Sequence, residues 1–475
     1  MPLVAGVDSS TQSTKVELRD ADSGMLVGSG RAPHPAVMPP VAEQDPADWW
    51  HAFESAIAQA TAEAGVDVDG IDAISVAGQQ HGLVALDAAG QVIRPAKLWC
   101  DTTSAADAKW LIDQLPAGPA GWAQACGSVP VAAFTITKLS WLHRKEPDAW
   151  ARLARVALPH DWLTLQLTGR LVTDRGDASG TGYWSPADGR YRWDLLAIVD
   201  GERDWSDALP EVLGPIDPAG TWNRAVVGPG TGDNMAAALG IGLREGDVAV
   251  SLGSSGTVFG VSPTPSADPS GAVAGFADAS GRFLPLVCTL NATKVTDAMG
   301  RLLGLDHAAF DAAALSADAG AGGMTMLPYL DGERTPNRPD ATGVLSGIRS
   351  DVEPAQLARA AVEGVVCGLL DGLDALAGHA SLDGRVHLVG GGARSAAFRQ
   401  VLADLSGRTV TTAEVAEAVA TGACVQAAAT LRRAAPDDVR AGWPLHTETL
   451  TDPAIDPELA AETRGRYRTL RERSA

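Results

Sequence analysis

The chain has 475 residues, of which 45% are hydrophobic, and a formal net charge of −21 at pH 7. This length predicts two sizeable domains rather than one core, and the negative charge argues against binding to nucleic acid or to anionic membranes. The sequence shows no basic leader, no apolar run as long as a membrane span and no C-x-x-C pair among its five scattered cysteines, so we expect a soluble protein of the reducing cytoplasm.

The first predicted element is a strand–turn–strand over residues 3–18, with an acid and several hydroxyls at its tip. Such a turn can hold phosphate oxygens through Thr11, Ser13 and Lys15, and Asp8 can hold a magnesium ion. An ordinary hairpin explains the same pattern, because Asp and Ser are favoured in turns. The sequence contains no Walker lysine motif, which argues against a P-loop fold.

A helix and a broken strand follow. Residues 45–63 predict a scaffold helix, with an Asp cap and a Pro at the first helical position. Residues 71–87 predict a buried strand that breaks at Gly78, so that Gln80 and His81 lie in a glycine-bounded turn. Side chains with both donors and acceptors can bind sugar hydroxyls there, although a structural histidine is an equal alternative.

The tryptophans are concentrated in the first half of the chain, where twelve of the thirteen lie at or before Trp222. Because indole rings stack on the C–H faces of sugars, this distribution indicates that the first lobe binds the sugar. Within residues 98–104 we single out Trp99 and Asp101 as rim residues of that site. Burial in a core is the alternative for any one tryptophan.

Residues 228–240 form a glycine-rich stretch that reads as the catalytic centre. Its glycines place Asp233 and Asn234 just ahead of a helix-forming run, Met235 to Leu239. Asp233 could cap that helix or act as a general base toward a substrate hydroxyl. The cap is the better explanation of this stretch alone, whereas the rest of the chain favours the base.

The second half of the chain repeats the plan of the first. Residues 247–261 again read as strand, turn and strand, with Ser254 and Ser255 at the turn, and residues 385–395 parallel residues 71–82 as a strand that runs into glycines. This repetition predicts a duplicated α/β domain. Two such turns facing each other would grip phosphates from both sides, with the active site in a cleft between the lobes.

The later glycine turn, with Gly391, Gly392 and Ala393, would let a planar ring approach the backbone. It lacks the G-x-G-x-x-G spacing of a dinucleotide fold, so we expect the adenosine of ATP rather than NAD. The helix predicted from Glu414 has a face of small residues, Ala420 to Ala423, that would permit close packing against the nucleotide lobe. Packing alone explains this face equally well.

The sequence resembles the FGGY family of carbohydrate kinases over nearly its whole length. Gly343 to Glu363 fits the family's C-terminal signature, and the segment around Lys138 and Trp141 fits the earlier signature in part. Thr103 stands where the family more often has a basic residue. The resemblance implies the actin and hexokinase fold, also called ribonuclease H-like, with a sugar-binding lobe over residues 1–240 and an ATP-binding lobe over residues 241–475 that ends in a helical tail.

The activity that the resemblance implies is ATP-dependent phosphorylation of a ketopentose, with D-xylulose and its terminal 5-hydroxyl favoured and Mg²⁺ required. A related kinase acting on ribulose, glycerol or another sugar or polyol stays open, as does a non-kinase actin-like ATPase. The expected partners are the sugar and ATP, and the oligomeric state is left open, with a homodimer as one candidate.

The motifs and the resemblance together give candidate residues in four roles. They are Asp233 as catalytic base; Gln80, His81, Trp99, Asp101, Asp233 and Asn234 for the sugar; Thr11, Ser13, Lys15, Ser254, Ser255, Gly391, Gly392 and Ala393 for ATP; and Asp8 for magnesium.

Overall fold

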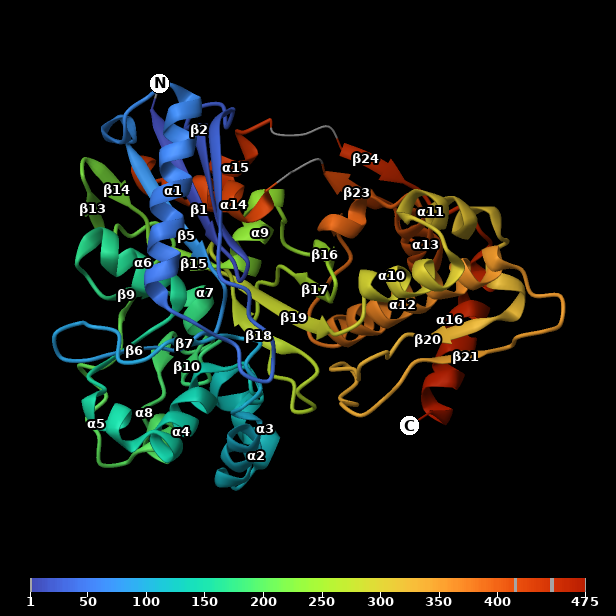
Figure 1. Ribbon diagram of the computed structural model, residues 1–475, viewed down its shortest axis with the longest axis horizontal. Helices are drawn as coiled ribbons and strands as arrows, with labels where there is room; N and C mark the ends of the chain where they lie inside the picture. The colour runs from blue at the N-terminus through green and yellow to red at the C-terminus, as the bar shows by residue number, and fades with distance from the viewer. Residues whose placement is uncertain (1, 414–416, 445–447, 475) are drawn as a thin grey trace. The chain divides into compact units, whose positions relative to one another are not determined.

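The computed structural model describes residues 2–413, 417–444 and 448–474, and the chain divides into two compact units. Unit 1 comprises Met1–Leu243, Pro263–Leu284 and Val415–Leu445, and unit 2 comprises Arg244–Ser262, Pro285–Glu414 and His446–Ala475. The units therefore interleave along the chain, whereas we expected one boundary after residue 240. Each unit combines helices with a mixed sheet (Figure 1), which confirms the predicted α/β class.

The main sheet of unit 1 contains the hairpin and the broken strand predicted from the sequence. Its strands are β1 (Leu3–Ser9), β2 (Ser13–Asp20), β3 (Leu26–Pro33), β5 (Ala73–Gly78), β13 (Gly220–Trp222), β14 (Ala225–Val227) and β15 (Thr231–Gly232). Their order is β13-β14-β5-β1-β2-β3, with β15 also paired to β5. From β3 to β13 the successive pairings are antiparallel, antiparallel, parallel, parallel and antiparallel.

The sheet of unit 2 has the same plan. Six of its seven strands are β16 (Val248–Leu252), β17 (Gly256–Gly260), β19 (Phe283–Thr289), β22 (Val386–Val389), β23 (Val410–Ala413) and β24 (Glu448–Thr451), and the seventh, β18 (Ala274–Ala277), is the outer neighbour of β19. In the order β19-β17-β16-β22-β23-β24 the pairings are again antiparallel, antiparallel, parallel, parallel and antiparallel. This shared sequence of pairings confirms the predicted duplication.

Helices cover both sheets. Those of unit 1 are α1 (Pro46–Ala64), α2 (Ala105–Gln114), α3 (Gly118–Cys126), α4 (Thr135–Lys145), α5 (Pro147–Arg152), α6 (Pro159–Thr168), α7 (Arg175–Ala178), α8 (Trp193–Val199), α9 (Asp233–Ile241), α14 (Ala418–Arg432) and α15 (Pro436–Ala441). Those of unit 2 are α10 (Thr293–Leu303), α11 (His307–Ser316), α12 (Pro354–Ala377), α13 (Ala396–Ser406) and α16 (Pro457–Arg473). Within the described ranges, no helix combines the length and apolar character that crossing a membrane requires.

Short strands and single turns complete the two units. The short strands are β4 (Glu43–Gln44), β6 (Val84–Leu86), β7 (Ala96–Lys97), β8 (Arg155–Ala157), β9 (Val172–Asp174), β10 (Trp184–Ser185), β11 (Arg190–Tyr191) and β12 (Glu211–Leu213) in unit 1, and β20 (Thr325–Leu327) and β21 (Val344–Ser346) in unit 2. The 3₁₀ turns are η1 (Val68–Gly70), η2 (Ala321–Gly323) and η3 (Gly391–Arg394).

Helices α1 and α14 pack on opposite faces of the unit 1 sheet. Ala5 and Val7 of β1 belong to the hydrophobic cluster that α1 completes with Trp49 and Phe53. Gly6 points the other way, because neighbouring residues of a strand face opposite sides, and a Cβ added there would lie 2.1 Å from the Ala420 carbonyl oxygen of α14. The sheet that carries the hairpin and the broken strand is thus buried on both sides.

The small-residue face of α14 allows its close approach to α9. A Cβ added to Gly240 would lie 2.0 Å from the Ala418 carbonyl oxygen, and one added to Gly422 would lie 1.9 Å from the Ala236 carbonyl oxygen. We expected this face to meet the nucleotide lobe, but α14 instead packs within unit 1 against α9 and β1. Residues 414–416, where the predicted helix began, lie outside the described residues.

Candidate active site

The β1–β2 turn places one buried carboxylate next to a cation. Asp8 is 1% exposed, and its Oδ1 accepts a hydrogen bond from Ser10 Oγ. Lys15 Nζ lies 3.4 Å from Asp8 Oδ2 and 2.6 Å from Glu417 Oε2. Burial raises the pKa of Asp8, while Lys15 and Ser10 act in the opposite direction. The hairpin is confirmed, and its acid and its lysine form one ion pair.

Thr11 connects this turn to the residues expected at the sugar. Its Oγ1 accepts a hydrogen bond from Trp99 Nε1 at 2.9 Å and donates to Gln79 Oε1 at 3.3 Å. Trp99 remains 40% exposed. Ser13, by contrast, is 2% exposed within β2, so its hydroxyl does not lie at the surface of the turn.

The Gln80–His81 turn follows the end of β5 at Gly78, as predicted. His81 adopts a left-handed backbone with φ of 68°, which a side chain other than glycine adopts at a cost. Its N–H donates to Asp177 Oδ1 at 3.4 Å, and its carbonyl oxygen accepts from Thr135 Oγ1 at 3.0 Å. The backbone of the turn is therefore held on both sides.

The predicted base and the predicted sugar residues come together at the start of α9. Asp233 Oδ1 accepts from the backbone N–H and the side-chain Nδ2 of Asn234, at 2.8 and 2.9 Å. Asn234 Nδ2 also donates to Gln80 Oε1 at 2.9 Å. Gly232 is the N-cap of α9, and a Cβ there would lie 2.7 Å from Gln80 Cγ, so the absence of a side chain permits this approach.

The environment of Asp233 suits a proton acceptor. Burial, followed by the negative charge of Asp8, raises the pKa of Asp233 to about 7, and the hydrogen bonds from Asn234 only partly oppose this shift. A general base is most effective when its pKa lies near the working pH. Asp233 is the first residue of α9, and the N-cap is Gly232. Asp233 therefore does not occupy the capping position that the alternative interpretation gave it.

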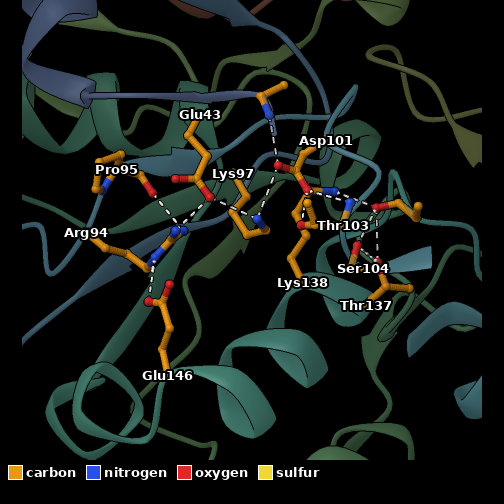
Figure 2. A network of polar contacts seen from close by, with 12 residues as sticks. Glu43, Arg94, Pro95, Lys97, Asp101, Thr103, Ser104, Thr137, Lys138 and Glu146 are labelled. Atoms are coloured by element: carbon orange, nitrogen blue, oxygen red, sulfur yellow. Dashed lines mark hydrogen bonds and ion pairs between the residues drawn. The ribbon is translucent and has the colours of Figure 1, made fainter. Parts of the chain in front are cut away.

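Asp101 is placed differently from the rim position that we expected. It is 0% exposed, and Figure 2 shows it between Thr103 and Lys97. Its Oδ2 accepts from Ala42 N at 2.9 Å and lies 3.2 Å from Lys97 Nζ. Its Oδ1 accepts from the backbone N–H and the hydroxyl of Thr103, at 3.0 and 2.5 Å. Both oxygens thus hold the loop that carries Trp99.

The network around Asp101 extends to two further acids, Glu43 and Glu146 (Figure 2). Lys97 Nζ lies 2.9 Å from Glu43 Oε1 and 3.9 Å from the centre of the Trp141 ring. Arg94 pairs with Glu43 and Glu146. Lys97 therefore supplies positive charge beside Asp101. The family more often has a basic residue at the position of Thr103, which is uncharged in this chain.

Unit 2 contains a cavity of about 1100 Å³. Its lining includes Ser254, Gly391 and Gly392 from the predicted nucleotide residues, together with Gly253. Ser255, which follows Ser254, is exposed, and Ala393, which follows Gly392, is 7% exposed. The two glycine-containing turns of unit 2 that we assigned to ATP thus line one cavity.

Glycine is required where the two turns meet. Gly390 has φ of 85°, and a Cβ there would lie 2.7 Å from the Leu252 carbonyl oxygen. A Cβ on Gly392 would lie 2.7 Å from Leu252 Cβ, whereas a Cβ on Gly391 would meet no atom within 4 Å. Gly391 therefore faces the open space that a planar ring would need.

Other residues of the cavity were not predicted. They include charged side chains of α10, of α11 and of the connection between them, among them Asp297, Arg301, Asp306 and Asp311. Asp311 accepts from Ser395 Oγ and, at 2.7 Å, from Ala396 N, so it holds the start of α13. Helical charges of this kind are usually solvated, and nothing in their local spacing marks them as cavity residues.

A second set of buried polar residues was also missed. His160, Asp161, Asp174 and Asp177 are each at most 2% exposed and lie close together in unit 1. The segments that contain them are rich in acids next to apolar or small residues, a pattern that could have marked them as buried. Among the described residues, no group of three or more His, Cys, Asp or Glu side chains could hold a metal ion.

Both halves of the chain are similar to known proteins. The N-terminal domain of the FGGY family of carbohydrate kinases matches residues 3–240, and the C-terminal domain of that family matches residues 248–431. The xylulose kinase of Streptomyces coelicolor is 46% identical over 465 residues, covering 96% of this chain and 92% of the relative. The xylulose kinase of Streptomyces rubiginosus is 44% identical with the same coverage. The crystal structure of xylulose kinase from Bifidobacterium adolescentis matches with a TM-score of 0.87 and 38% identity, covering 99% of each chain.

Proposed function

We propose that this chain, which belongs to the FGGY family of carbohydrate kinases, transfers the γ-phosphoryl group of ATP to the terminal 5-hydroxyl of D-xylulose. The choice of sugar is supported by the two Streptomyces relatives, which are xylulose kinases 46% and 44% identical to this chain. The observation that carries the proposal is the chain of contacts from Asp233 through Asn234 to Gln80.

Asp233 would accept the proton of the attacking hydroxyl. Its pKa of about 7 leaves a substantial fraction of the carboxylate ionised at neutral pH and still basic enough to take a proton. Asn234 fixes one carboxylate oxygen through two hydrogen bonds, which leaves the other for the substrate. Gln80, His81 and the exposed indole of Trp99 would bind the sugar, and Asp101 would act through the loop that it holds.

Asp8 would hold magnesium. Mg²⁺ in phosphoryl-transfer enzymes is typically bound by one or two carboxylates together with phosphate oxygens and water, so a single buried acid fits this requirement. Burial raises the pKa of Asp8, and burial followed by the charge of Asp8 raises the pKa of Asp233, so a bound cation would favour the ionised form of both acids. Bound magnesium would neutralise the negative charge of the phosphates. Lys15 and Thr11 remain candidates for phosphate contacts, whereas the hydroxyl of Ser13 is buried within β2.

The cavity of unit 2 would bind ATP. Gly391 offers open space for the adenine ring, and the exposed Ser254–Ser255 turn offers hydroxyl and backbone donors for phosphates. We place the reaction in the cytoplasm, where the free thiols of all five cysteines would be stable.

A coupled ADP-release assay over D-xylulose, D-ribulose, L-ribulose, glycerol and gluconate tests the proposal. A site that binds hydroxyls through buried polar groups rejects a misplaced hydroxyl strongly, because the mismatch leaves those groups unpaired. We expect D-xylulose to lead in kcat/KM by about tenfold or more. A different leading substrate would refute the choice of sugar, and no release above the sugar-free rate would favour an ATPase that is not a kinase.

A further inference from the structure

One buried histidine in unit 1 is surrounded by three carboxylates and has no role in the steps proposed above. His160 is 0% exposed. Its Nε2 lies 3.2 Å from Asp161 Oδ1, 3.4 Å from Asp174 Oδ1 and 3.5 Å from Asp177 Oδ2. We call these four residues the His160 cluster.

His160 also touches the two segments that carry the candidate sugar and base residues. A Cβ added to Gly230 would lie 2.6 Å from His160 Nδ1, and one added to Gly78 would lie 3.0 Å from His160 Cβ. Gly78 precedes the Gln80–His81 turn, and Gly230 precedes Asp233. The imidazole thus packs against the backbone of the Gly230 segment, and the Cβ and backbone of His160 pack against that of the Gly78 segment.

The carboxylates of the cluster are hydrogen-bonded to the same two segments. Asp177 Oδ1 accepts from the backbone N–H of His81 at 3.4 Å, and Asp174 Oδ2 accepts from Thr231 Oγ1 at 2.8 Å. Asp174 also caps α7, the helix that contains Asp177. Each segment is therefore held twice, once by contact with His160 and once by a carboxylate that the imidazole faces.

A proton on His160 balances part of the negative charge of the cluster. Burial alone would lower the pKa of His160, but the surrounding carboxylates raise it to about 9, so the imidazole is charged at neutral pH. Burial also raises the pKa of Asp161 and, further, that of Asp177. Within the part of the chain that the structure describes, these side chains do not form a metal site. The imidazolium is thus the cation that the three acids share.

We propose that His160 is a positioning residue for sugar recognition: through Asp177 and Asp174 it fixes the Gln80–His81 turn against the loop that carries Asp233. Removing it would let the left-handed turn at His81 relax, and the polar groups that bind the sugar hydroxyls would lose their fixed places. This inference rests on the function proposed above and adds a determinant of sugar selectivity that does not touch the sugar.

Two variants test the inference, with two matched controls. His160→Gln removes the positive charge but retains one N–H donor, and Asp177→Asn removes the acceptor charge at nearly constant volume. His387→Gln changes another buried histidine that lies near a carboxylate, in unit 2, and Asp107→Asn changes another buried aspartate of unit 1 that pairs with Arg144. A third variant, His160→Leu, removes all polar function, and its fold is checked by circular dichroism.

We expect His160→Gln and Asp177→Asn to raise the KM for D-xylulose by about tenfold, the scale of one lost hydrogen bond. They should also reduce the ratio of kcat/KM between D-xylulose and D-ribulose, while the KM for ATP and the sugar-independent ATP hydrolysis stay within about twofold of the wild type. His160→Leu should show a larger loss than His160→Gln, because the retained amide partly replaces the donor. Both control variants should keep the selectivity of the wild type.

Three results would overturn the inference. One is a sugar selectivity and KM within about twofold of the wild type in both His160→Gln and Asp177→Asn. Another is an equal loss for sugar and ATP, which would indicate a general effect on folding. The last is the same change of selectivity in the controls. The wild-type assay separates this inference from the proposed function: if no sugar is phosphorylated by the wild type, the proposed function fails and this inference fails with it.

Discussion

At the scale of single residues, the structure explains why Asp233 is suited to accept a proton. Burial and the charge of Asp8 raise its pKa to about 7, while Asn234 holds one of its oxygens in place. A carboxylate with an unshifted pKa near 3.8 would be a far weaker base. Asp233 therefore combines a fixed orientation with a tuned proton affinity.

Replacing this carboxylate should abolish most of the turnover. We expect Asp233→Asn to lower kcat by about 10² or more, as the loss of a general base suggests, because the amide cannot accept the proton of the hydroxyl. Binding of D-xylulose, measured by isothermal titration calorimetry, should persist. A variant with near-wild-type turnover would assign Asp233 to a structural role at the start of α9.

The pKa of Asp233 also predicts how activity depends on pH. The base works only when deprotonated, so kcat/KM should fall as the pH decreases through about 7 and reach a plateau above it. The measurement is kcat/KM for D-xylulose between about pH 5 and 9, with coupling enzymes in excess at every pH. A profile that remains flat down to about pH 5 would contradict a raised pKa at the base.

At the scale of elements, local patterns predicted those parts of the fold whose causes are local. The Asp45-capped helix, the hairpin around Asp8 and the helical tail, which is α16, are found as expected, because caps, turns and periodicity act within a few residues. The small residues of α14 indicated close packing but not its partner. That partner, α9, comes from far away in the chain, where no local pattern specifies it.

Local patterns also predicted some residues of the candidate site and misplaced or missed others. Gln80, Asn234 and Asp233 could be assigned from glycine-framed motifs, and the structure brings them together. Asp101 looked like a rim residue, because a polar side chain near a turn is usually exposed, but its partners Ala42 and Lys97 lie on other elements and bury it. The His160 cluster was missed for the same reason, since its members approach one another only in the folded chain.

The contact of α14 with α9 makes a quantitative prediction. Gly422→Ala would place a Cβ 1.9 Å from a backbone oxygen of α9, so the helices must separate, and we expect a loss of stability of about 1–3 kcal/mol or more. Gly465→Ala is the matched control, because a Cβ in α16 meets no atom within 4 Å and should stabilise by about 0.5–1 kcal/mol. The measurement is the thermal unfolding midpoint of each variant, which should be lower for Gly422→Ala than for Gly465→Ala. Equal midpoints would contradict the tight α14–α9 contact.

At the scale of the whole molecule, one strand-pairing scheme occurs in both units, and the two units carry different candidate sites. Both sheets have the same order of parallel and antiparallel pairs, but unit 1 carries the acids and the candidate sugar residues, whereas unit 2 carries the glycine-lined cavity. The two units thus share one sheet topology but differ in the residues at the ends of their strands.

Separate substrate sites predict separate patterns of protection in hydrogen–deuterium exchange. D-xylulose alone should protect residues 78–82 and 228–234 of unit 1. A non-hydrolysable ATP analogue alone should protect residues 253–256 and 390–395 of unit 2, where the turns line the cavity. Protection of the unit 2 turns by the sugar alone, with none in unit 1, would contradict the assignment of the two substrates.

The transfer of phosphate to the sugar is tested most directly by ³¹P NMR of a reaction mixture of the wild-type protein, MgATP and D-xylulose. We predict a new phosphomonoester resonance, coupled to the protons on carbon 5 of the sugar, that grows in step with ADP and is almost absent with Asp233→Asn. A mixture in which ATP yields only inorganic phosphate, or no product at all, would contradict the account.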